Sequence, residues 1–362
     1  MKIFQYILSR TMTTQLFLLL LPIACAYDNN APGARLPVLG WSSWVALGPD
    51  SQHPIFDYCD EASVKHAADA FVTLGFKEAG YTGFHLDDCW ADVERNASGF
   101  LQGERDHFPN TMKPVVDYVH SKGLNFGLYT CAGEYTCVGK RPGSKNHSKK
   151  DANVFAEWGV DWVKQDNCNT EGMGKPEEYY QLMSTALNES GRSIAFAMCE
   201  WGKDAPWIWG NDMAQSGRMG GDHTGIWSST KSLIAQSAVI PMINTGQAWY
   251  WNDMDMLETG NGERAAHANN KLSNMTAGEY KTEFSMWAIS ASPLVVTTPI
   301  MNCSAGQVSN ISWTTLPQND DCKVTLRKQF SKDKCVKDVC IRKFLAPTFV
   351  QSDIIYIRLI NL

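Results

Sequence analysis

The chain has 362 residues, of which 44% are hydrophobic and 19% charged, and its formal net charge is −6. This balance is typical of a globular protein with room for one large domain and a smaller appendage. The acidic charge disfavours nucleic acid or an anionic membrane as a partner. After the N-terminus, no apolar run reaches the ~20 residues that a membrane span needs.

Residues 1–26 have the pattern of a secretory signal peptide. Lys2 and Arg10 precede a short apolar run, and Ala24-Cys25-Ala26 is a small-residue cleavage site. Ten cysteines follow Cys25, which in an exported chain predicts mostly disulfides. We therefore expect a glycoprotein of the secretory pathway, extracellular or lysosomal/vacuolar. The Asn-x-Ser/Thr sequons are at Asn96, Asn146, Asn188, Asn274, Asn302 and Asn310.

From residue 36 one unit recurs: an apolar strand, a polar loop, an amphipathic helix and a glycine before the next strand. Asp151 is a candidate N-cap for one helix, and Gly159 a candidate C-cap. Strand 214–217 has the poorest pattern. The predicted strands are 38–41, 81–86, 126–129, a fourth ending near Asp166, 194–198, 214–217, 248–251 and 294–297. The predicted helices are 64–74, 114–121, 152–158, 176–187, 227–239 and 281–291.

Alternating strands and helices imply parallel strands with crossover connections. Eight strands between residues 36 and 300 fit an α/β (β/α)₈ TIM barrel, whose usual size is ~250 residues. The alternative is an open doubly wound sheet, which usually carries a glycine-rich phosphate loop that Gly40-Trp-Ser-Ser-Trp44 does not match. We expect a barrel at 27–300, and a short, truncated or atypical C-terminal β region at 301–362.

Acids, single bases and tryptophans recur where the predicted strands end. Lys164 and Asp166 lie two residues apart, so in a strand they share a face. Carboxylates accept hydrogen bonds from sugar hydroxyls, and indole faces pack on a pyranose ring. The alternatives are a structural ion pair at Lys164–Asp166, and a metal site at Asp253 and Asp255 on one strand face. The histidines lack zinc-binding spacing, and we expect no metal or cofactor.

The motifs at these strand ends resemble those of glycoside hydrolase family twenty-seven, the melibiase or α-galactosidase family. They are GWSSW (40–44), GFHLDDCW (83–90), HSKGLNFGLY (120–129), WGVDWVKQDNC (158–168), CEWG (199–202), WNDMDML (251–257) and ASPLVV (291–296). The resemblance covers about residues 36–300. It implies a barrel enzyme that hydrolyses terminal α-D-galactosides with retention, by double displacement.

The resemblance also implies roles for individual residues. Asp166 matches the nucleophile and Asp222 the general acid/base, with Lys164 and Arg218 expected to favour the ionised form of Asp166. The carboxyl groups of Asp166 and Asp222 should lie ~5–5.5 Å apart. Glu200 favours a plain galactoside over an N-acetylated one. The matched substrate-binding residues are Trp44, Asp87, Asp88, Lys164, Cys199, Glu200, Trp201, Arg218 and Asp255.

The resemblance further implies a Cys137–Cys168 disulfide, a second one at Cys59–Cys89, and a free Cys199. Family members usually carry an antiparallel β-domain after the barrel, which residues 301–362 match poorly. Two alternatives therefore stay open: an α-N-acetylgalactosaminidase, and a sugar-binding protein that has lost turnover. A homodimer also stays open as the assembly state.

Overall fold

The computed structural model describes residues 29–46, 59–138, 141–240, 250–259, 275–298 and 300. In these ranges eight strands form one sheet in the order β7-β6-β5-β4-β3-β2-β1-β8. Every neighbouring pair of strands is parallel. The strands are β1 (Leu39–Ser42), β2 (Gly83–Leu86), β3 (Asn125–Cys131), β4 (Trp162–Asp166), β5 (Ala195–Cys199), β6 (Ser216–Arg218), β7 (Trp251–Asp253) and β8 (Leu294–Val296).

The two ends of this sheet meet just beyond β7. Leu257 forms a parallel bridge with Val296 of β8. Its backbone N–H donates to the carbonyl of Val295 at 2.8 Å, and its own carbonyl accepts from the N–H of Thr297 at 3.2 Å. The eight strands therefore form a (β/α)₈ barrel, which confirms the predicted fold class.

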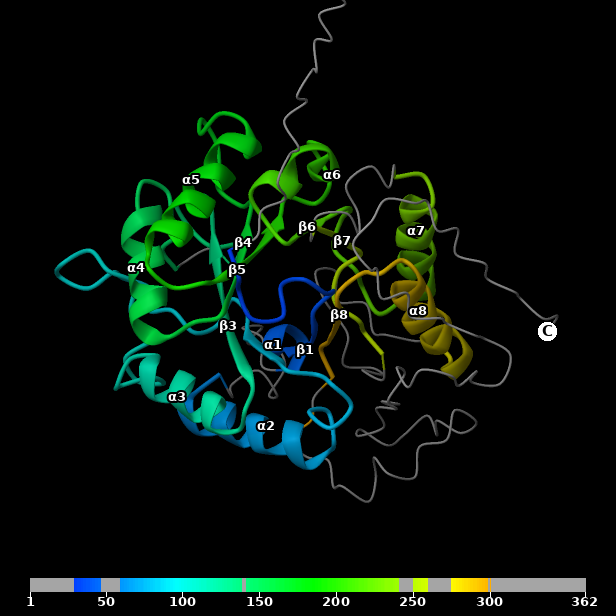
Figure 1. Ribbon diagram of the computed structural model, residues 1–362, viewed down its shortest axis with the longest axis horizontal. Coiled ribbons are helices and arrows are strands. Elements are labelled where there is room, and N and C mark those ends of the chain that lie inside the picture. The colour runs from blue at the N-terminus through cyan, green and yellow to red at the C-terminus, as the bar shows by residue number, and fades with distance from the viewer. Residues whose placement is uncertain are drawn as a thin grey trace, which may run out of the picture.

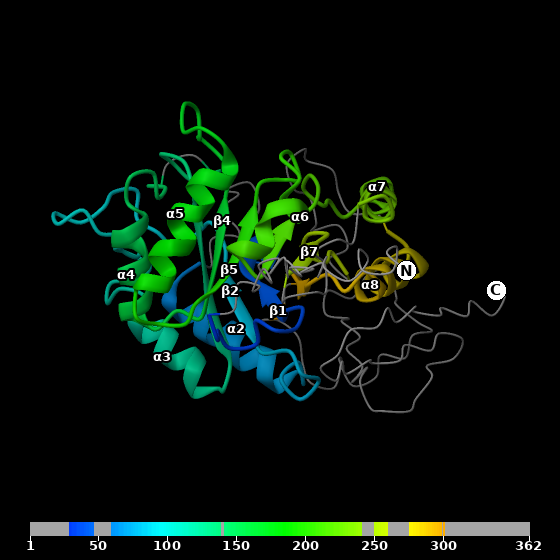
Figure 2. The ribbon, with the colours of Figure 1, turned by 45° about the horizontal axis from the view of Figure 1, so that its top comes forward.

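The helices surround the strands (Figure 1). Helices α2 to α5 pack one against the next outside β2–β5, and α7 packs against α8 (Figure 2). The buried face of α2 is Val64, Ala67, Ala68 and Phe71, the spacing of one side of a helix. The helices are α1 (Ser43–Ala46), α2 (Glu61–Thr73), α3 (Lys113–Ser121), α4 (Ser148–Trp158), α5 (Pro176–Glu189), α6 (Pro206–Trp209), the 3₁₀ helix η2 (Gly210–Asp212), α7 (Trp227–Ser237) and α8 (Ala277–Ile289).

The predicted N-cap at Asp151 is wrong. Helix α4 begins three residues earlier, and His147 is its N-cap residue. The carboxylate of Asp151 is buried and accepts from both terminal nitrogens of Arg95, at 2.6 and 2.8 Å. A buried carboxylate with a bidentate guanidinium partner is satisfied without capping the helix. The predicted C-cap at Gly159 is confirmed by its φ of 86°.

The strand predicted at 248–251 lies later in the chain, because β7 starts at Trp251; residues 248 and 249 lie outside the described ranges. The short helices α1 and α6 were not predicted. The disulfides Cys59–Cys89 and Cys137–Cys168 are confirmed, and Cys131 and Cys199 are free and buried.

Several predictions concern residues outside the described ranges. These are the signal peptide at 1–26, the C-terminal β region at 301–362, the sequons at Asn274, Asn302 and Asn310, and Cys303, Cys322, Cys335 and Cys340. Within the described ranges, no helix has both the length and the apolar character that a bilayer crossing requires.

Candidate active site

The carboxyl ends of parallel barrel strands meet at one rim, and most of the predicted site residues lie there. Asp166 is the last residue of β4, Cys199 the last of β5 and Arg218 the last of β6. The barrel encloses a small cavity of about 30 Å³. Five of the predicted residues line it: Asp87, Lys164, Cys199, Arg218 and Asp255.

Lys164 is the central cation of this rim. Its Nζ donates to Oδ2 of Asp87 at 2.9 Å and lies 4.0 Å from Oδ2 of Asp166. The predicted placement of Lys164 and Asp166 on one face is thus confirmed. Nζ also lies 6.0 Å from the ring centre of Trp44 and 5.2 Å from that of Tyr129. Burial disfavours the charge, but the nearby carboxylates, Asp87 first, hold the pKa of Lys164 well above its ordinary value.

Asp166 is a buried carboxylate, 7% exposed. Burial raises its pKa and the charge of Asp222 adds to this effect, whereas the Lys164 ammonium and the backbone N–H of Asn167 (3.0 Å) lower it. The net direction is upward. Lys164 favours the ionised form of Asp166, as predicted, but burial outweighs its effect on the pKa. Arg218 is engaged with two other carboxylates instead.

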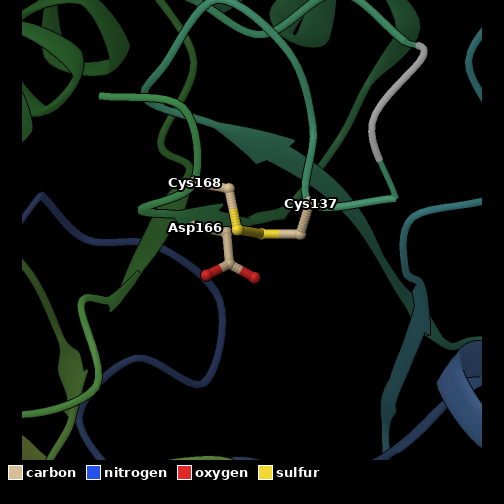
Figure 3. A group of neighbouring side chains, drawn as sticks. All are labelled: Cys137, Asp166 and Cys168. Carbon is tan, nitrogen blue, oxygen red and sulfur yellow. A yellow bond between two sulfur atoms is a disulfide. The ribbon is translucent and has the colours of Figure 1, made fainter. Parts of the chain in front are cut away.

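The Cys137–Cys168 disulfide lies against Asp166 (Figure 3). Both sulfur atoms and one carboxylate oxygen of Asp166 are within 4.8 Å of one another. Because the two sulfurs are bonded to each other, this group offers no thiolate to a metal ion. The disulfide instead joins the loops after β3 and β4 directly above the Asp166 carboxylate.

Arg218 holds two carboxylates and a thiol. It is 3% exposed, and its Nη2 lies 3.0 Å from Oδ1 of Asp222 and 2.9 Å from Oδ2 of Asp255. Its Nη1 lies 3.4 Å from Sγ of Cys199. The Asp222 side chain is 60% exposed, so the two proposed catalytic carboxylates occupy opposite environments, one buried and one at the solvent. Such a difference suits two carboxylates that perform different steps.

Asp255 lies beyond the end of β7, with a φ of 83°. Its carboxylate accepts backbone N–H bonds from His223 and Met256, both at 2.7 Å. Its own N–H donates to Oδ1 of Asp253 at 2.8 Å. Asp255 therefore does not share a strand face with Asp253, which contradicts the placement that the alternative metal site required.

Asp88 and Glu200 are directed at loop backbone. Asp88 accepts from the N–H of Val138 at 3.0 Å, and burial raises its pKa to about 6. Glu200 accepts from the N–H of Asp204 at 2.9 Å, and burial raises its pKa to about 7. Next to Glu200, Trp201 has a φ of 58°. Sugar contacts by Asp88, Glu200 and Trp201 stay predictions.

Two histidines of this region were not predicted. His85 lines the cavity and stacks on Trp162, with ring centres 4.0 Å apart. His223 is buried and bonds Asp255 through its backbone N–H. In the sequence, only the position of His223 next to Asp222 could have indicated that this histidine belongs to the site.

The family model described as "Alpha galactosidase A", of the melibiase type, matches residues 36–312. The chain belongs to this family. An α-galactosidase A from Cellvibrio japonicus is 39% identical over 280 residues, covering 75% of this chain and 64% of the relative. An α-galactosidase from Cyamopsis tetragonoloba is 42% identical over 262 residues, covering 72% of this chain and 58% of that relative.

Among solved structures, an α-galactosidase from Saccharomyces cerevisiae superimposes with a TM-score of 0.66 at 32% identity. The match covers 76% of this chain and 61% of that one. The chain thus spans less than two thirds of the length of these melibiase relatives.

Proposed function

We propose that this melibiase-family chain is a retaining α-galactosidase. The observation that carries the proposal is a buried carboxylate, Asp166, beside the Lys164–Asp87 pair, at the rim where Arg218 holds the exposed carboxylate of Asp222. The matched relatives named α-galactosidase support the same reaction.

In the proposed reaction, a carboxylate oxygen of Asp166 attacks the anomeric carbon while Asp222 gives its proton to the departing glycosidic oxygen. The bond from the anomeric carbon to that oxygen breaks, and a galactosyl ester forms on Asp166. Asp222 then takes a proton from water, whose oxygen attacks the anomeric carbon and releases Asp166. Two inversions at one carbon give net retention.

The cavity groups suit a hexose with several free hydroxyls. Lys164 and Arg218 donate hydrogen bonds, whereas Asp87 and Asp255 accept them. Each of these side chains is already paired with an opposite charge. Little side-chain entropy then remains to be lost when substrate binds.

Substrate choice is tested with 4-nitrophenyl α-galactoside and its 2-acetamido counterpart. We expect turnover of the first and little of the second; the reverse preference would make the chain an α-N-acetylgalactosaminidase. If galactose binds but neither substrate is cleaved, the chain is a sugar-binding protein. Proton NMR of the earliest product should show the α-anomer of galactose, and the β-anomer would exclude a retaining mechanism.

We further propose that the protein acts in the secretory pathway or outside the cell, on oligosaccharides, glycolipids or glycoproteins. The described sequons at Asn96, Asn146 and Asn188 are exposed, as glycosylation requires. A homodimer and the lack of a nucleic-acid partner stay predictions.

A further inference from the structure

His223, which directly follows Asp222, is anchored to two other segments. Its backbone N–H donates to Oδ2 of Asp255 at 2.7 Å. In its ring, Nδ1 lies 3.0 Å from the carbonyl oxygen of Met256, and Nε2 lies 3.0 Å from Oγ1 of Thr230 in α7. With only 4% of its surface exposed, the residue ties the loop after β6 to α7 and to the segment after β7.

These partners fix the tautomer of the His223 ring. A carbonyl oxygen can only accept a hydrogen bond, so Nδ1 carries the hydrogen that reaches Met256. The Thr230 hydroxyl has one hydrogen, which reaches either Nε2 or Sδ of Met275, 3.2 Å away. Burial lowers the pKa of His223, which favours the neutral ring. The bond from Nδ1 to Met256 therefore sets the orientation of the ring.

Helix α8 also contacts the His223 ring. Oε1 of Glu283 lies 3.6 Å from Nδ1 of His223, and neither side chain is more than 1% exposed. The same oxygen accepts from the backbone N–H of Glu258 at 2.8 Å. The Trp287 ring lies 5.1 Å from the imidazole, centre to centre. These contacts link α8 to His223, the residue beside Asp222.

The side chain of Asp222 itself is 60% exposed on a loop. A general acid must reach the glycosidic oxygen within hydrogen-bond distance, and an error of 1 Å can cost about 10²-fold in rate. Arg218 contacts one oxygen of Asp222, but it also holds Asp255. The backbone next to Asp222 therefore needs a second fixed point.

We propose that His223 is a positioning residue: its buried ring fixes the backbone from which Asp222 delivers and takes its proton. The inference rests on the proposed function. This task differs from a role in folding alone. A change at His223 should impair proton transfer by Asp222 and leave the attack by Asp166 unaffected.

The test compares two substrates whose leaving groups differ in their need for a proton, so that a loss of proton transfer is distinguished from a loss of folding or binding. Phenolate needs protonation as it departs from phenyl α-galactoside, whereas fluoride needs little when it departs from α-galactosyl fluoride. Values of kcat/KM on both substrates are measured for the wild type, His223→Leu and His223→Asn, corrected for the folded fraction by circular dichroism. The reference for lost proton transfer is Asp222→Ala. The control for lost stability is Val154→Ala, in the buried face of α4.

We expect His223→Leu to lower kcat/KM about tenfold or more on phenyl α-galactoside and much less on α-galactosyl fluoride. His223→Asn should recover most of the loss, because its Nδ2 can take the place of Nδ1 and donate to Met256. Val154→Ala should change both substrates by the same factor.

An equal loss on both substrates with His223→Leu, or no recovery with His223→Asn, would overturn the positioning role. Failure of the proposed function has a different signature. The wild type would then cleave neither substrate, or Asp222→Ala would fail to discriminate between them.

Discussion

The Nζ atom of Lys164 lies 4.0 Å from Oδ2 of Asp166, two residues along the same strand. This distance exceeds that of a hydrogen bond, and the shorter contact of Lys164 is with Asp87. The ammonium therefore favours the charge on Asp166 without occupying its lone pairs. A carboxylate in this state stays available to attack a carbon atom.

Replacing Lys164 by Met should shift the pH dependence. Its ammonium lowers the pKa of Asp166 against the effect of burial, so its removal should raise that pKa further. Because a nucleophile must be ionised, the acidic limb of the kcat/KM profile should move to higher pH. Lys122→Met, which removes a surface partner of Asp69, is the matched control. An unmoved acidic limb in Lys164→Met would contradict this account.

Asp166→Asn should lower kcat by at least about 10³-fold, because an amide cannot form the galactosyl ester. Its melting temperature should stay equal or rise, since a buried charge is replaced by a neutral group of the same shape. Asp69→Asn at the surface is the control and should keep full activity. Retention of more than a trace of turnover would remove Asp166 from its proposed role.

The two disulfides form a matched pair, with sequence separations of 30 and 31 residues. Replacing either pair by Ser should lower the free energy of unfolding by about 3 to 4 kcal/mol, as measured in urea. Both sulfurs of the Cys137–Cys168 pair lie within 4.8 Å of a carboxylate oxygen of Asp166. We expect its loss to lower kcat of the folded fraction about tenfold more than loss of Cys59–Cys89 does. Equal effects on kcat would assign both disulfides to stability alone.

Glu283 should make stability depend on pH. Burial raises its pKa from 4.5 to about 8, so between these values the unfolded chain releases a proton that the folded protein keeps. Stability from this group is then present below pH 4.5 and is lost as the pH rises toward 8, by about 2 to 4 kcal/mol. Glu283→Gln does not titrate. The melting temperature of Glu283→Gln should rise relative to that of the wild type as the pH increases from 5 to 8. A difference in melting temperature that does not change with pH would argue against the raised pKa.

The barrel was predictable because its signals are local. Hydrophobic periodicity and glycines at helix ends depend on a few neighbouring residues, and Gly159 ends its helix as predicted. The strand period of two likewise placed Lys164 and Asp166 on one face. The disulfides were predictable from the resemblance to a known family.

The errors have a common physical cause. Asp151 has the local character of a cap, but Arg95 pairs with it from 56 positions away. Asp255 was assigned to a strand, yet its carboxylate is bonded by Arg218 and by the His223 backbone, more than thirty residues earlier. In both cases a distant partner offered a better hydrogen bond than the local backbone did.

The sequence by itself determined the order of strands and helices, the rim at which the polar residues gather and the family to which the chain belongs, since these follow from local pattern and motif. Only the tertiary structure decided how each charge behaves. It raises the pKa of Asp166 by burial, divides Arg218 between Asp222 and Asp255, and seats His223 against α8. The energy of a charge depends on its burial and on partners brought close by folding, and no short stretch of sequence contains either.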